Sequence, residues 1–520
     1  MPSSFGPADD RRRRPIAALA LALLVVANVA LHLALLRAAP YLDEGCFASQ
    51  GWWIRHGALF YRDAWNERGP LIYLISAALF SVAPYRLESV RILALLLSTA
   101  QLVLLFAVAR RWIGGLWSLA APAFYLVWHP FFLGTFYMGE QLDGTLILAA
   151  VLALSWESAR APTAGRAAVA GLALSLLGMD KQSGIALFVL LGAYAAWRAT
   201  REGTGRRVIL AYVLAALPPW LLLFSRYAAA GEVPLLVQGL LFPIREYQVA
   251  RYARGIEPTV LRLAAPLFVV LVAEVARRAV RRPPWTGLFL LWLAGTLVLM
   301  GPNAFLYHFL ALLLPASIAF AAFLAGAAAR RRPAIPALAL AALLGLSIAM
   351  VAESAQFVRN NLDPARWGEI EALAATIRAR TAEGDPIWVF PHESTLYLFA
   401  DRRSASRYPF LLPWTASPRV LAGVVRDLAA HPPRWIVYTD LSRRTTSGIP
   451  VRDYAAPVVK FVESRYAVAG MTRSGLVLLR RLPDGTTLSA EDARDVADVF
   501  AAPDHPVDLS RRFPLIGPAR

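Results

Sequence analysis

Long apolar runs separated by short basic clusters dominate the chain up to about residue 351. The longer runs approach the roughly 20 residues that a helix needs to cross the hydrocarbon core of a bilayer. They are uninterrupted rather than alternating, which indicates helices and not the strands of a membrane barrel. The pattern predicts about eleven transmembrane helices, at 16–36, 87–109, 116–128, 142–156, 167–179, 185–197, 208–224, 260–276, 285–301, 305–328 and 336–351.

The arginine clusters between these runs predict the orientation. Cytoplasmic loops of membrane proteins are enriched in Lys and Arg, and the clusters fall at alternate ends of successive runs. With residues 11–14 in the cytoplasm, the large outside segments are 37–87 and 225–258. We expect a plasma (inner) membrane protein with a cytoplasmic N-terminus. The first run exceeds the roughly 7–15 apolar residues of a signal peptide, so we expect an uncleaved signal anchor.

The pattern changes after residue 353. Amphipathic helical stretches at 367–380 and 418–430 alternate with short runs typical of strands, which lie at 387–390, 435–438, 458–461 and 476–479. They predict a small α/β domain, which the topology places outside the membrane. The tail is expected to be a loosely ordered extension. The predicted organisation is a basic N-terminus at 1–14, an all-α polytopic membrane domain at 15–352, the extracytoplasmic α/β domain at 353–482 and the extension at 483–520.

Composition and charge agree with this architecture. The chain is 58% hydrophobic and 17% charged, with a mean hydropathy of +0.50, which leaves too little charge for the surface of a soluble protein of this length. The net charge of +18 would suit a nucleic-acid partner, but its distribution follows the cytoplasmic loops. We therefore expect membrane lipids and no nucleic acid as partners. Cys46 is the only cysteine, so no internal disulfide is possible.

The first outside segment carries the strongest candidate chemistry. Two adjacent carboxylates, Asp43 and Glu44, closely follow the first membrane helix. In a solvated loop such a pair costs little, and a solvated loop is one interpretation. Apolar and aromatic residues flank the pair on both sides, however. They indicate a segment folded onto the bilayer surface, where a carboxylate pair without a function is a liability.

Several short motifs follow this pair, and their order matters more than any one of them. They are Gly57-Ala58-Leu59-Phe60-Tyr61-Arg62-Asp63, Arg68-Gly69-Pro70-Leu71, Arg91 at the start of the next helix, Lys181-Gln182-Ser183-Gly184, Tyr307-His308-Phe309 with Pro315, Leu396-Tyr397, and Asp401 to Tyr408. Together they resemble the GT-C glycosyltransferases of the protein O-mannosyltransferase and lipid A aminoarabinose transferase group. The resemblance covers most of the chain. One departure is that a family Lys-Pro pair is Arg68-Gly69 here.

The resemblance implies a GT-C fold and an inverting transfer of a sugar to an acceptor hydroxyl on the outer membrane face. The donor would be a polyprenyl-phosphate sugar, and the acceptor a lipid, a glycan or a protein. Such a transfer needs a base beside the acceptor hydroxyl, and Asp43 is the candidate. Glu44 would orient it or help to hold a metal. Glu67 is a second acidic candidate, whereas Asp63 suits a turn.

Substrate contacts are expected from further charged residues. The leaving phosphate needs cations, although arginines near a membrane also reach toward lipid headgroups. Glu140 and Asp143 stand where a helix begins, which also suits the helix dipole. A divalent metal is possible, but no ligand spacing typical of zinc sites occurs. The candidates for substrate binding are Glu67, Arg68, Arg91, Glu140, Asp143, Lys181, Arg245, Arg251 and His308.

Two other classes of protein compete with this interpretation. A transporter or lipid flippase would place ionisable residues at mid-membrane and often contains two related halves. Here the interesting charges gather at the outer ends of the helices. A non-catalytic membrane scaffold that presents its outer domain would not need Asp43 and Glu44.

Overall fold

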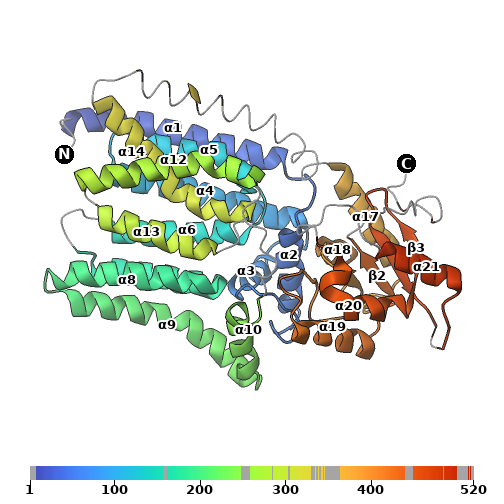
Figure 1. The fold of residues 1–520 in the computed structure, drawn as a ribbon. Coiled ribbons are helices and arrows are strands. Elements are labelled where there is room, and N and C mark those ends of the chain that lie inside the picture. Colours follow the sequence, from blue (N-terminus) through green and yellow to red (C-terminus); the bar gives the residue numbers. More distant parts are fainter. Residues whose placement is uncertain are drawn as a thin grey trace. The chain divides into compact units, whose positions relative to one another are not determined.

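The computed structural model describes two compact units, each built from three stretches of chain (Figure 1). The helical unit comprises Met1–Leu36, Arg91–Val233 and Arg254–Gln356, and the mixed unit comprises Arg37–Val90, Pro234–Ala253 and Phe357–Arg520. The described residues within them are 7–155, 161–247, 258–283, 285–301, 305–329, 364–439, 449–483 and 485–500, with a few isolated positions besides.

The helical unit contains a helix at each predicted run up to residue 328. The run at 336–351 lies largely outside the described residues. The helices are α1 (Pro7–Ala34), α4 (Leu87–Trp112), α5 (Ala120–Trp128), α6 (Gly139–Leu154), α7 (Ala164–Asp180), α8 (Ile185–Thr200), α9 (Gly205–Ala229), α12 (Pro258–Arg281), α13 (Thr286–Met300) and α14 (Phe309–Ala329).

Five helices among the described residues are long and apolar enough to cross a membrane. They are Arg14–Ala34, Leu87–Trp112, Gln182–Thr200, Gly205–Ala229 and Leu306–Ala329. The chain is therefore a multi-pass membrane protein. The total of about eleven crossings stays a prediction, because several of the other helices are shorter.

The packing of the helical unit is centred on α14. This helix is apolar all round, most of its residues are buried, and it contacts α5, α12 and α13. A helix without a polar face is expected inside a bundle. The helices α8 and α9 lie side by side (Figure 1). The helix α9 also packs along α7. The Ser175 hydroxyl of α7 donates to the Ala216 carbonyl of α9 at 2.6 Å, which satisfies a polar group inside the bundle.

The mixed unit combines a four-stranded sheet with helices from all three of its stretches. The strands are β1 (Trp388–Phe390), β2 (Trp435–Tyr438), β3 (Tyr466–Met471) and β4 (Val477–Arg481). Their order is β1-β2-β4-β3, with β1 and β2 parallel and the other pairs antiparallel. The helices are α2 (Leu42–Arg55), α3 (Leu71–Leu79), α10 (Val233–Arg245), α17 (Pro364–Ala379), α18 (Thr395–Ala400), α19 (Pro418–Ala430), α20 (Val451–Glu463) and α21 (Ala490–Val499).

Two predictions for this unit are wrong. The run at 458–461 was predicted as a strand but belongs to α20, whose buried residues recur at helical spacing from Val451 to Val462. The tail was predicted to be loosely ordered throughout, which is wrong for Ala490–Val499, where α21 forms; the residues after 500 lie almost entirely outside the described part. The Ser489 side chain caps the first turn of α21, and Phe500 packs on Tyr438 with ring centroids 4.7 Å apart. The predicted strands at 387–390, 435–438 and 476–479 are confirmed as β1, β2 and β4.

Candidate functional site

Asp43 and Glu44 lie in the first turn of α2, within the mixed unit. Glu44 is completely buried, and its Oε2 accepts a hydrogen bond from the Tyr41 backbone N–H at 3.0 Å. This contact satisfies one of the donors that a helix start leaves unpaired. Asp43 is only half-buried. The two carboxylates are therefore not equivalent: Glu44 holds the helix start, while Asp43 keeps a surface that a substrate can reach.

Glu67 lies in the same neighbourhood as Asp43. After burial, the two carboxylates are the groups that raise the pKa of the Cys46 thiol. They act in the same way on the Tyr247 hydroxyl, whose pKa lies well above its ordinary value because of burial and then of Glu67 and Asp43. The fold thus brings the first outside segment and the end of α10 to one acidic cluster, formed by Asp43, Glu67, Cys46 and Tyr247.

The Glu67 carboxyl has an unusual proton affinity. Burial raises its pKa from 4.5 to about 7, against the opposing effects of a backbone hydrogen bond and of Arg68. The residue as a whole is partly exposed, but its Oε2 atom is fully shielded from solvent. A carboxyl of this kind exchanges its proton near neutral pH, which suits acid–base chemistry.

The start of α2 is pressed against the C-terminal part of the mixed unit. A Cβ atom added at Gly45 would lie 2.3 Å from the Thr395 backbone nitrogen, so only glycine allows this approach. Thr395 begins α18, after a turn in which Glu393 has a φ of +132°. The Arg366 guanidinium holds Glu393 through an ion pair of 2.6 Å. Sequence reasoning missed this contact, because the two segments are far apart along the chain.

A second set of predicted residues meets within the helical unit. Lys181 Nζ lies 3.3 Å from Glu140 Oε1, and His308 Nε2 lies 3.8 Å from the same oxygen. Glu140 and Asp143 are both buried in the first two turns of α6. The predicted placement of Glu140 at a helix start is thus confirmed, and its ion pair with Lys181 is a contact that the sequence did not show.

The predicted arginines differ in their surroundings. Arg91 Nη1 donates to the Leu35 and Leu36 carbonyls at 3.2 and 3.0 Å, just beyond the end of α1. Arg68 has its backbone N–H bonded to the Asn66 side chain at 2.9 Å. Arg245 is exposed at the end of α10. Arg251 lies outside the described residues. Arg91 therefore has at least one structural role.

No metal site is evident in the described part of the chain. There, no three side chains of His, Cys, Asp or Glu come together as a group that could hold an ion. Cys46 accepts hydrogen bonds from Gln50 Nε2 at 2.9 Å and Asn66 Nδ2 at 3.4 Å. These contacts, with its raised pKa, describe a buried thiol and not a reactive one.

Comparisons with known proteins agree on the fold. No family model matches the chain, and no curated protein matches it. The structure of ArnT from Cupriavidus metallidurans bound to undecaprenyl phosphate matches with a TM-score of 0.59 and 14% identity, over 90% of this chain and 99% of that one. An Archaeoglobus fulgidus oligosaccharyltransferase tethered with an acceptor peptide matches with a TM-score of 0.54 and 11% identity, over 92% and 75%.

A further structure, of AglB from Archaeoglobus fulgidus with an inhibitory peptide and a dolichol-phosphate, matches with a TM-score of 0.53 and 12% identity. The match extends over 91% of this chain and over 75% of the AglB chain. ArnT, a lipid A aminoarabinose transferase, and AglB are members of the GT-C superfamily. The GT-C fold predicted from the motifs is therefore confirmed.

Proposed function

We propose that this protein is a membrane glycosyltransferase that moves a sugar from a polyprenyl-phosphate donor to an acceptor hydroxyl. The observation that carries the proposal is the shared fold: it extends over about nine-tenths of the chain, to proteins solved with undecaprenyl phosphate and with a dolichol-phosphate. The acidic cluster adds the chemistry that such a transfer requires. The reaction takes place on the outer face of the plasma membrane, with the N-terminus in the cytoplasm.

Asp43 is the general base of this reaction. The acceptor oxygen attacks the anomeric carbon as its proton passes to the Asp43 carboxylate. The bond between the anomeric carbon and the phosphate oxygen breaks, and its electron pair leaves with the lipid phosphate. Attack opposite the leaving group inverts the anomeric centre. Glu44 positions Asp43 by capping α2, and Glu67 contacts the substrate while it exchanges a proton near neutral pH.

The leaving lipid phosphate is stabilised by cations, because its negative charge grows as the bond breaks. Arg guanidinium groups suit phosphate oxygens, and a lysine supplies a compact charge. Arg91 contributes less in this role, because part of its guanidinium binds carbonyl groups. Glu140 and His308, which lie beside Lys181, would contact the substrate there. Asp143, on the same helix as Glu140, is a further candidate for substrate contact. The proposed phosphate ligands are Lys181, Arg245 and Arg251, with Arg68 and Arg91 as the alternatives.

The test is a transfer assay on the purified chain with a panel of radiolabelled polyprenyl-phosphate sugars, both hexosyl and pentosyl. Asp43→Asn keeps the size and most hydrogen bonds of the side chain but removes the base. We expect it to lose at least ~10²-fold in turnover. Asp63→Asn is the matched control in the same segment, because Asp63 accepts a hydrogen bond from the Leu59 N–H at 2.8 Å and has a turn role.

The outcomes separate two claims. Wild-type turnover in Asp43→Asn would overturn the assignment of the base. Absence of transfer from every donor, together with movement of a lipid-linked sugar across vesicle membranes, would overturn the transferase in favour of a lipid flippase.

A further inference from the structure

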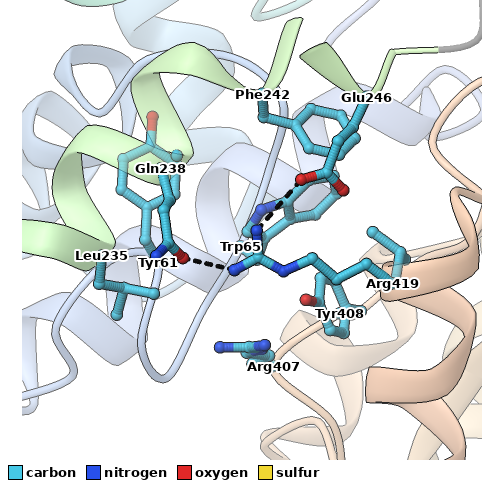
Figure 2. Close-up of a pocket in the computed structure, with 11 residues that line it drawn as sticks. Tyr61, Trp65, Leu235, Gln238, Phe242, Glu246, Arg407, Tyr408 and Arg419 are labelled. Carbon is cyan, nitrogen blue, oxygen red and sulfur yellow. Dashed lines mark hydrogen bonds and ion pairs between the residues drawn. The ribbon is translucent and has the colours of Figure 1, made fainter.

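A pocket outside the acidic cluster lies entirely within the mixed unit (Figure 2). Three segments form it: the first outside segment, α10 with the residue after it, and the stretch around α19. The pocket is partly open to solvent, and its empty space, open solvent included, is about 340 Å³. The functions proposed above use none of its residues.

Aromatic rings make up a wall of this pocket. The Trp65 ring is 4.8 Å from the ring of Phe242 and 5.1 Å from that of Tyr408, both in edge-on contact. A Cβ atom at Gly239 would lie 2.6 Å from the Tyr61 ring, so α10 is pressed directly onto that ring. Packed aromatic rings keep their positions, and the wall is therefore preformed for a ligand.

The polar groups of the pocket are also held in place. Arg419 binds the Glu246 carboxylate at 3.1 Å and the Gln238 side-chain oxygen, as Figure 2 shows. The other Glu246 oxygen accepts from the Ser417 hydroxyl at 2.9 Å. The charge of Glu246 is thus balanced by Arg419. The carboxylate retains lone pairs that can accept hydrogen bonds from ligand hydroxyls, and the Gln238 amide retains its N–H donors.

Arg407 differs from Arg419. Its guanidinium lies 4.9 Å from the centre of the Tyr408 ring, and its Nε is buried with no hydrogen-bond partner in the described part of the structure. The nearby Asp427 carboxylate accepts instead from the Arg407 backbone N–H and from the Ser406 hydroxyl, at 3.2 and 2.8 Å. A buried donor of this kind is uncommon and indicates a group that a ligand would satisfy.

We propose that this pocket binds a sugar residue that carries an acidic group, as part of the acceptor. The apolar C–H face of a pyranose fits against aromatic rings such as Trp65 and Tyr408. Its hydroxyl groups can donate to Glu246 and accept from Gln238. Its carboxylate or phosphate accepts from Arg407 in a charge-assisted hydrogen bond. The proposal that an acidic sugar binds here is argued from the pocket residues alone. The proposal that this sugar belongs to the acceptor rests on the proposed function.

The test measures binding of two probes to the full chain in lipid nanodiscs. We expect methyl glucuronide to bind at least ~10-fold more tightly than methyl glucoside, since only the first offers a carboxylate to Arg407. Arg407→Ala should remove this preference. Arg426→Ala, an exposed arginine on α19, is the matched control and should keep it. The melting temperature of each variant shows whether it is folded.

Each result decides a claim. Equal affinity for the two probes in the wild type, or an unchanged preference in Arg407→Ala, overturns the acidic-sugar site. Displacement of methyl glucuronide by an acidic peptide that binds more tightly identifies a peptide site instead. If the preference depends on Arg407 but no sugar donor supports transfer, the binding site stands and the proposed function fails. If transfer occurs and Arg407→Ala leaves the KM for an acidic glycan acceptor unchanged, the pocket is not the acceptor subsite.

Discussion

Replacing Glu67 by glutamine tests whether burial in the acidic cluster controls the proton on this carboxyl. The pKa of Glu67 is raised from 4.5 to about 7, so the folded chain keeps a proton that the unfolded chain releases. Below about pH 4.5 both states are protonated, and the stability that this proton confers is fully present. It is lost as the pH rises through about 7, because a buried charge must then form. The rise of the Glu67 pKa from 4.5 to about 7 corresponds to a loss of at most roughly 3 kcal/mol in the free energy of unfolding.

The assay is the melting temperature of the purified chain between pH 5 and pH 8. Glu67→Gln is neutral throughout, so the wild type should lose several degrees relative to the variant as the pH increases. Any other effect of the substitution on stability shifts the melting temperature by the same amount at every pH. The control is Glu383→Gln, an exposed carboxyl after α17, whose difference from the wild type should not change with pH. A constant difference for Glu67→Gln, or a wild type that gains stability relative to it, would refute the reasoning.

Three other predictions concern the start of α2, the donor phosphate and the topology. Gly45→Ala should lower the transfer rate by roughly tenfold or more, because its Cβ would lie 2.3 Å from the Thr395 nitrogen; Gly368→Ala, with open space around it, should not. An alkaline phosphatase fused after Leu482 should be active, and an active cytoplasmic reporter there instead contradicts the predicted orientation. The donor phosphate is tested with Lys181→Ala, Arg245→Ala and Arg251→Ala, measured separately for their dependence on donor concentration. A variant that lacks a phosphate ligand should lose roughly tenfold or more in catalytic efficiency. If all three variants keep wild-type kinetics, none of these residues binds the donor phosphate.

The membrane helices could be predicted because their signal is local. An apolar run in lipid must satisfy its own backbone groups, which it does as a helix whatever its neighbours are. The small α/β domain was less predictable. A short apolar run such as 458–461 suits a strand or a buried helix equally well. The missed strand β3 contains Ala467, Ala469 and Gly470, which are poor strand formers, and a bulge interrupts its pairing after Val468.

Only part of the candidate site could be predicted from the sequence. The order of motifs pointed to Asp43, Glu44 and Glu67, and Glu140 and Lys181 were chosen without any sign that they form an ion pair. Gly45 was not singled out, and Arg407 was named only as part of the motif from Asp401 to Tyr408, without a role of its own. Gly45 matters because it lies against Thr395, and Arg407 because it lines a pocket with residues from other segments. Contacts between residues that are far apart in sequence leave no pattern along the chain.

The sequence by itself determined that this protein crosses a membrane several times, where most of its helices lie, and which acidic residues follow the first helix. These properties depend on runs of neighbouring residues and on their solvation in lipid or water. Only the tertiary structure decided that Asp43 and Glu67 share one cluster with Tyr247, that the Glu67 pKa rises to about 7, and that Arg407 lines a pocket. Burial and electrostatic interactions act across space, so they follow from which distant segments the fold packs together.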